Sequence, residues 1–86
     1  GAGSGRGKKI CSLCVKILEQ VRETAGEDPD EAAVDSALGK VCRALGRRLS
    51  RVCKSLVKKY REKISEAVQN GEEPRDVCVA MGICKD

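Results

Sequence analysis

The sequence predicts a small, compact, all-α domain that is cross-linked by three disulfides. Apolar residues recur at intervals of three and four over most of the 86 residues, which is the spacing of one face of an α-helix. Six cysteines in so short a chain are typical of a disulfide framework made in an oxidising compartment. Tyr60 is the only aromatic residue, so the core must consist of aliphatic side chains and half-cystines, and a domain of this size then depends on its cross-links.

Residues 1–7 are rich in glycine, and we expect them to form a flexible N-terminal segment ahead of a single domain at residues 8–86. Because no signal peptide is present, the chain is expected to be a processed mature form. The first helix is predicted to end at Gly26, since glycine commonly follows the last turn of a helix. Its apolar face is formed by Ile10, Cys14, Ile17, Leu18, Val21 and Ala25.

A second helix is predicted to begin with Asp28 as its cap. Pro29 suits the first helical position, and Glu31 stands three residues after the cap, as in a capping box. The helix is expected to break at Gly46. Its apolar face is formed by Val34, Ala37, Leu38, Val41, Cys42 and Leu45.

A third apolar face keeps one helical phase for about five turns. It predicts either one long helix or two helices with a bend near Tyr60, whose place in the pattern favours the core. Asn70 and Gly71 end this segment, and a short last helix is predicted between Pro74 and Gly82. The third face is formed by Leu49, Val52, Cys53, Leu56, Val57, Tyr60, Ile64, Ala67 and Val68.

The six cysteines allow 15 connectivities, which the predicted helices narrow. Cys42 and Cys53 lie on either side of the turn at Gly46, so an antiparallel helix hairpin would bring them together. A bond between Cys11 and Cys14, one helical turn apart, would be strained, so these two are expected to reach the last pair, for example in a nested arrangement that ties the chain ends together. The alternative is a set of reduced thiols that binds zinc, for which only the Cys11-x2-Cys14 spacing is suitable. The last pair is Cys78 and Cys84.

Cysteine spacings of Cys-x2-Cys, Cys-x10-Cys and Cys-x5-Cys on helical faces resemble those of the saposin-like family, over residues 8–86. The basic central segment and the closing sequences PRDVC (74–78) and GICK (82–85) are most similar to the NK-lysin and granulysin type. The resemblance implies a compact five-helix saposin-like bundle with the pairs Cys11–Cys84, Cys14–Cys78 and Cys42–Cys53 as scaffold. It also implies an antimicrobial or cytolytic role in innate immunity, with secretion and storage in cytolytic granules.

The net charge of +4 hides an uneven distribution. Residues 40–63 carry ten basic side chains and one acidic one, Glu62, for a net +9, whereas residues 1–39 carry −2 and residues 64–86 carry −3. Five of the ten, Arg47, Arg51, Lys54, Lys58 and Arg61, form a stripe opposite the apolar face of the same helix. A segment of one sign attracts polyanions, although such a stripe is more commonly a solvated face. The predicted membrane-binding residues are Lys40, Arg43, Arg47, Arg48, Arg51, Lys54, Lys58, Lys59, Arg61 and Lys63.

A basic amphipathic helix favours a membrane surface with anionic phospholipids. We therefore expect a protein that is a monomer in solution, binds bacterial or target-cell membranes electrostatically and disrupts them, with an oligomer on the membrane as one option. The family resemblance adds the hypothesis that a hinge at Gly46 or Gly71 opens the domain and turns its core toward lipid. The alternative is a lipid-binding or lipid-extracting carrier or activator of the saposin type. Those relatives are commonly acidic and glycosylated, whereas this chain is basic and Asn70 is not in a glycosylation acceptor sequence.

Other classes of function are disfavoured. The chain has no histidine, no Gly-x-Ser-x-Gly sequence and no phosphate-binding glycine loop, so neither an enzyme nor a cofactor or metal site is expected. Specific nucleic-acid binding is not expected either, because aromatic residues that stack on bases are missing. Without Trp or Phe, Tyr60 is the only residue of the kind that anchors proteins at membrane interfaces, so we expect shallow insertion that relies on charge.

Overall fold

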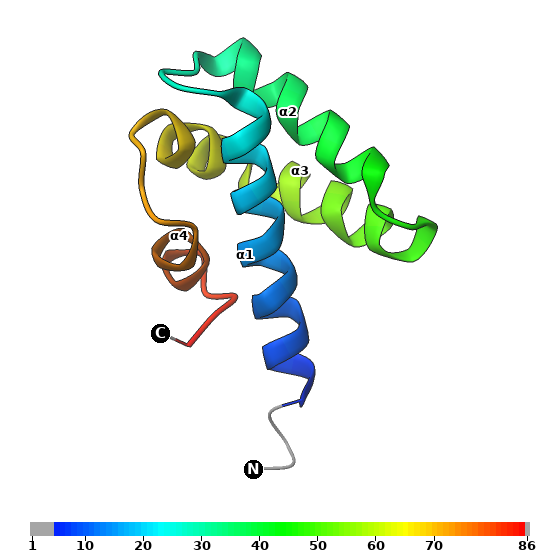
Figure 1. Ribbon diagram of the computed structural model, residues 1–86. Coiled ribbons are helices and arrows are strands. Elements are labelled where there is room, and N and C mark those ends of the chain that lie inside the picture. Colours follow the sequence, from blue (N-terminus) through cyan, green and yellow to red (C-terminus); the bar gives the residue numbers. More distant parts are fainter. Residues whose placement is uncertain (1–4, 86) are drawn as a thin grey trace.

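Four helices make up the fold in the computed structural model, which describes residues 5–85, with side chains from residue 10 onward. They are α1 (Gly5–Ala25), α2 (Glu31–Ala44), α3 (Arg47–Gln69) and α4 (Pro74–Ala80). Helix α1 contacts all three others, and α2 also contacts α3. Figure 1 shows α2 and the first part of α3 as an antiparallel hairpin on one side of α1, with the end of α3 and α4 on its other side. The predicted flexible segment 1–7 overlaps α1 from Gly5 on, and residues 1–4 lie outside the described residues.

The predicted five-helix bundle is wrong in its helix count, and the reason lies at Tyr60. The backbone there leaves the helical region, with φ −117° and ψ 23°, but helical hydrogen bonding continues on both sides, so α3 is one kinked helix. A bend near Tyr60 was one of the two options open from the sequence. The kink lets the second part of α3 turn into the core while the first part stays paired with α2.

The start of α2 differs from the prediction. Asp30, and not Asp28, is the cap: its side chain accepts a hydrogen bond of 2.8 Å from the backbone N–H of Ala33, which satisfies one of the free donors at the helix start. Asp28 instead adopts a left-handed conformation with φ 48°. The connection therefore uses two residues more than predicted before the helix begins at Glu31.

Two tight turns at glycine shape the C-terminal half. After α3, the N–H of Glu72 donates to the carbonyl of Ala67 and that of Gly71 to Val68, which is a Schellman motif with glycine in the left-handed conformation. The same motif recurs after α4 around Gly82, whose φ is 79°. This second turn brings the chain back toward α1, which places the last cysteine beside the first.

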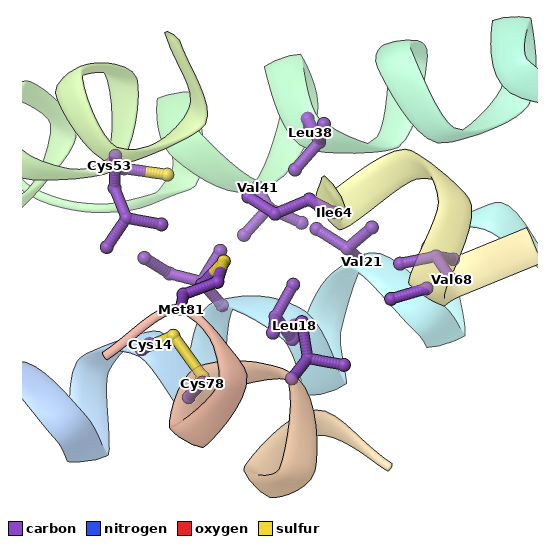
Figure 2. Close-up of a cluster of buried hydrophobic side chains, with 14 of the residues drawn as sticks. Cys14, Leu18, Val21, Leu38, Val41, Cys53, Ile64, Val68, Cys78 and Met81 are labelled. Carbon is purple, nitrogen blue, oxygen red and sulfur yellow. A yellow bond between two sulfur atoms is a disulfide. The ribbon is translucent and has the colours of Figure 1, made fainter. Parts of the chain in front are cut away.

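The core is aliphatic, as the composition predicts. Figure 2 shows Leu18 and Val21 of α1, Leu38 of α2, and Ile64 of α3 converging in a cluster of buried side chains. Three residues predicted on core-facing stripes are not covered: Ile10, Leu49 and Val52 are 48%, 44% and 40% exposed. They lie near the beginnings of α1 and α3, where the apolar face of each helix extends past the neighbouring helices and is left uncovered. Tyr60 is half-buried and packs against the core.

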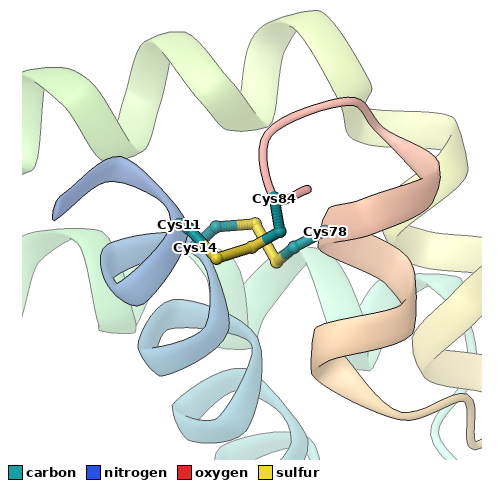
Figure 3. Close-up of a disulfide and its surroundings, with 4 residues drawn as sticks. All are labelled: Cys11, Cys14, Cys78 and Cys84. Atoms are coloured by element: carbon teal, nitrogen blue, oxygen red, sulfur yellow. A yellow bond between two sulfur atoms is a disulfide. The ribbon is translucent and has the colours of Figure 1, made fainter. Parts of the chain in front are cut away.

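Three disulfides join Cys11 to Cys84, Cys14 to Cys78 and Cys42 to Cys53. This is the pairing that the family resemblance implies, and the first two bonds have the nested arrangement. Figure 3 shows both nested bonds between one turn of α1 and the C-terminal segment. Because all six cysteines are bonded, the zinc alternative has no free thiols and is excluded.

Candidate membrane-binding surface

The ten predicted membrane-binding residues all lie on the α2–α3 hairpin, and all ten side chains are exposed. Lys40 and Arg43 belong to the last turns of α2, and the other eight belong to α3 between Arg47 and Lys63. We refer to these ten side chains as the cationic hairpin. Helix pairing therefore brings together charges that the sequence places on two separate segments, and it directs them to solvent and away from the core.

Most of the cationic hairpin is not neutralised by the protein itself. Within the described part of the chain, the ion pair recorded for these ten residues is that of Arg61 with Asp35, at 2.7 Å. The guanidinium holds the pKa of the Asp35 carboxyl below its ordinary value, chiefly through their hydrogen bonds. Lys63 donates to the carbonyl of Ala80 at 3.3 Å, and the Lys59 ammonium lies 5.5 Å from the centre of the Tyr60 ring. These contacts leave a concentrated positive field.

Two exposed apolar residues, Leu49 and Val52, accompany these charges at the beginning of α3. Sequence reasoning assigned both to the core because they fit the helical period. They stand among Arg47, Arg48 and Arg51 in the sequence, so apolar and cationic side chains share the tip of the hairpin. Over residues 5–85, no helix combines the length and the apolar character needed to cross a bilayer.

A groove of about 490 Å³ runs between α2 and α3. Its rim carries Arg43, Lys54, Lys58 and Arg61, with Asp35 as the single acidic residue. Its remaining lining is made of small or apolar residues, Leu38, Gly39, Cys42 and Val57. No sequence motif identifies this groove, because its two walls come from different helices.

The opposite end of the molecule is acidic. A hollow of about 610 Å³ at the turn between α1 and α2 is lined by Glu23, Glu27 and Asp28, with Arg22 as its one basic residue. Three acidic side chains are thus gathered at an end of the fold away from the tip of the cationic hairpin. A molecule with its charge divided in this way orients its positive end toward an anionic surface.

Comparison with known proteins agrees with this architecture. A family model described as saposin-like type B, region 2, matches residues 51–84. The solved NMR structure of NK-lysin from pig superposes with a TM-score of 0.82 at 31% identity, covering 90% of this chain and 97% of that one. The antimicrobial peptide NK-lysin of Equus caballus is 37% identical over 75 residues, which are 87% of this chain and 51% of the relative. Saposin-C of Cavia porcellus is 28% identical over 74 residues, 86% of this chain and 91% of the relative.

The chain thus spans about half the length of the horse relative, while it matches nearly the whole of the pig NK-lysin structure in both sequence and fold. One domain thus holds the three disulfides and the kinked third helix, and its α2–α3 hairpin carries the basic charge. The chain belongs to the saposin-like family, and within that family it is of the NK-lysin type.

Proposed function

We propose that the protein is a cationic antimicrobial or cytolytic effector that binds anionic phospholipid membranes and disrupts them. The observation that carries the proposal is the cationic hairpin: ten basic side chains, all exposed, with one ion pair among them in the described structure. A surface that merely keeps a protein soluble mixes both signs of charge. This surface sets ten basic side chains against two acidic ones, Asp35 and Glu62. The horse relative is named antimicrobial peptide NK-lysin, which fits the same role.

Electrostatic attraction is sufficient for binding. Each basic side chain close to an anionic surface contributes about 1 kcal/mol, and the effect fades beyond a Debye length of about 8 Å at physiological salt. If half of the cationic hairpin faces the lipid at one time, the attraction is about 5 kcal/mol, which favours the bound state by more than about a thousandfold. The apolar side chains of Leu49 and Val52 then enter the boundary between headgroups and acyl chains.

Disruption requires more apolar surface than these two residues supply. We propose that the domain opens at Gly71, in the turn after α3, which separates the α2–α3 hairpin from α1 and exposes core side chains to lipid. A hinge at Gly46 would instead part α2 from α3, and the Cys42–Cys53 disulfide closes the chain across that turn. The three disulfides permit this movement, because none of them joins the hairpin to α1 or α4. An added cross-link between α1 and α2 tests the opening: leakage should fall, and undiminished leakage by the locked protein would rule the hinge out.

The resemblance to NK-lysin and granulysin also suggests the setting in which the protein acts. We propose that it is secreted after storage in cytolytic granules, is a monomer in solution and, as one option, assembles into an oligomer on the membrane. No cofactor or catalytic step is needed for this activity. A second candidate is a lipid carrier, which is favoured by the likeness to saposin-C over nearly the whole of that protein.

Dye release from vesicles separates the two candidates. Anionic vesicles of phosphatidylglycerol and zwitterionic vesicles of phosphatidylcholine are compared at low and high salt. Leakage restricted to the anionic vesicles and suppressed by salt is the expected result for a charge-driven lytic protein. Lipid transfer between vesicles without leakage would favour the carrier, and a protein that binds neither vesicle would refute both proposals.

A further inference from the structure

The groove between α2 and α3 has the chemistry of a site for one phospholipid headgroup. Its acidic residue, Asp35, is already engaged: the Arg61 guanidinium donates to both carboxylate oxygens, from Nε at 3.2 Å and from Nη2 at 2.7 Å. The other three cations on the rim, Arg43, Lys54 and Lys58, have no ion pair in the described structure. Internal neutralisation thus removes one cation and one anion from the groove and leaves three positive groups around it.

The positions of these three cations suit a phosphate group. Lys54 and Lys58 are four residues apart on α3, so they are neighbours on one face of the helix. Arg43 lies across the groove on α2. Two ammonium groups and a guanidinium supply several charge-assisted donors, which is the arrangement that binds phosphate oxygens.

The floor of the groove distinguishes a lipid from a free anion. Leu38 and Cys42 lie beneath it and are already covered, at 2% and 3% exposed. The apolar surface open to a ligand is that of the half-buried Val57 and of the aliphatic stems of Lys54 and Lys58. Inorganic phosphate has no group that would contact apolar side chains. A phospholipid does, because its glycerol and the first methylenes of its acyl chains adjoin the phosphate.

A glycine of α2 lines the groove. Gly39 lies in the interior of α2, and a Cβ atom built on it would meet nothing within 4 Å. In the interior of a helix glycine is less favourable than alanine, so the space it leaves comes at a cost to helix formation. A large side chain at this position has room beside the groove and is expected to occupy part of it.

We propose that this groove binds the phosphate headgroup of a single anionic phospholipid. Arg43, Lys54 and Lys58 bind the phosphate, and Val57 contacts the glycerol and the upper acyl chain together with the aliphatic stems of the two lysines. The proposal rests on the proposed membrane-binding function and adds a defined lipid site to it. The protein would then bind the bilayer in two ways. One lipid per protein occupies the groove, and the whole cationic hairpin is attracted to the anionic surface.

The test uses a soluble lipid, so that no membrane is present. Dihexanoyl-phosphatidylglycerol below its micelle-forming concentration is titrated into the isotopically labelled protein while backbone amide signals are followed by NMR. We expect saturable shifts with one-to-one stoichiometry, largest around Gly39, Arg43 and Val57. Inorganic phosphate and dihexanoyl-phosphatidylcholine serve as comparison ligands, and both are expected to bind more weakly.

Two variants probe the site from different directions. Lys54→Gln/Lys58→Gln should weaken binding by about tenfold or more, because it removes two charge-assisted contacts. Its control, Lys16→Gln/Lys85→Gln, removes the same charge from exposed side chains outside both the groove and the cationic hairpin and should bind within about twofold of the parent, since distant exposed charges are screened. Gly39→Leu fills the groove without any change of charge and should also lose binding, while thermal unfolding verifies that it is folded.

The outcomes separate the site from the wider function. Equal losses in the two Gln pairs, or unchanged binding by Gly39→Leu, would overturn the site and leave diffuse attraction as the whole of the lipid contact. Binding that depends on phosphate alone, with no preference for the lipid over inorganic phosphate, would also overturn it. Vesicle leakage is measured on the same variants. If Gly39→Leu still releases dye from anionic vesicles, the proposed function stands, whatever the result for the lipid site.

Discussion

Arg61 and Asp35 form a two-point contact that fastens α3 to α2 directly after the kink at Tyr60. The Arg61 guanidinium donates to both oxygens of the carboxylate, and the next side chains on the inner face of α3, Ile64 and Ser65, are already buried. The ion pair thus marks the point at which α3 changes from a helix exposed along most of its surface to one that packs into the core. Since the Asp35 carboxylate loses its charge when it is protonated, and its pKa is lowered by Arg61, the contact depends on pH.

The first prediction concerns acid. The pKa of Asp35 is lowered in the folded protein by its hydrogen bonds with Arg61, so its contribution to stability is present above the unfolded-state pKa of about 3.9 and is lost as the pH falls through the lower folded-state value. Thermal unfolding of the parent should therefore lose more stability between about pH 5 and pH 2 than that of Asp35→Asn. The difference should be small, because the pair is exposed, and parallel curves would show that the ion pair contributes nothing.

The second prediction concerns the exposed apolar tip. Leu49→Ser/Val52→Ser removes apolar surface that is already exposed, so the free energy of unfolding should change little. If these side chains enter the membrane, the loss of roughly 1–2 kcal/mol of transfer free energy should lower partitioning into anionic vesicles by about tenfold. Vesicle co-sedimentation measures this. The control is Leu56→Ala, which lies on the same helix but is only 8% exposed and should instead destabilise the fold by about 2–5 kcal/mol.

A third prediction contrasts two glycines. Gly71 has φ 71° in the turn after α3, so Gly71→Ala should cost about 1 kcal/mol of stability, because a Cβ atom disfavours the left-handed conformation. Gly39 is helical and faces open space, so Gly39→Ala should stabilise the protein by about 0.5–1 kcal/mol. Denaturation with guanidinium measures both. Changes of the same sign in the two variants would contradict the assigned backbone conformations.

A fourth prediction follows from the nested disulfides. Replacing Cys11 and Cys84 with alanine leaves the ends joined by Cys14–Cys78, so only a short effective loop is released and the loss should be about 3 kcal/mol in the chain-entropy model. Replacing all four cysteines releases the long loop as well and should cost about 4 kcal/mol more. Equilibrium unfolding of the two variants tests this. If the two variants were equally stable, the Cys14–Cys78 bond would not lower the conformational entropy of the unfolded chain, and the prediction would be wrong.

The sequence was a good guide to the helices and to their connections. Glycine at positions 26, 46, 71 and 82 predicted where helices end, because three of these positions require positive φ and the other stands at the start of α3. The cap of α2 was predicted at the wrong aspartate because Asp28 and Asp30 flank Pro29. Only the backbone conformation decides which of the two carboxylates reaches a free N–H at the helix start. The number of helices depended on the backbone of a single residue, Tyr60.

The candidate site was only partly predictable. The basic residues could be identified one by one, since charge is a property of the sequence. The exposure of Leu49 and Val52 could not, because it depends on how far the neighbouring helices extend over the beginning of α3. The groove was hidden for a similar reason: Arg43 and Lys54 are eleven positions apart and meet only when the hairpin closes. A glycine within the apolar pattern of α2 was the one available signal.

The bond between Cys11 and Cys84, whose Cα atoms are 4.8 Å apart, has a mechanical consequence. A tensile force applied between the two ends of the domain passes directly through this bond and bypasses the helices between them. Pulling on the ends therefore cannot unravel α2 or α3, and the chain from residue 11 to residue 84 behaves as inextensible. Force can reach the hairpin only through contacts at its side, so a rearrangement under load takes the form of a sideways parting of helices.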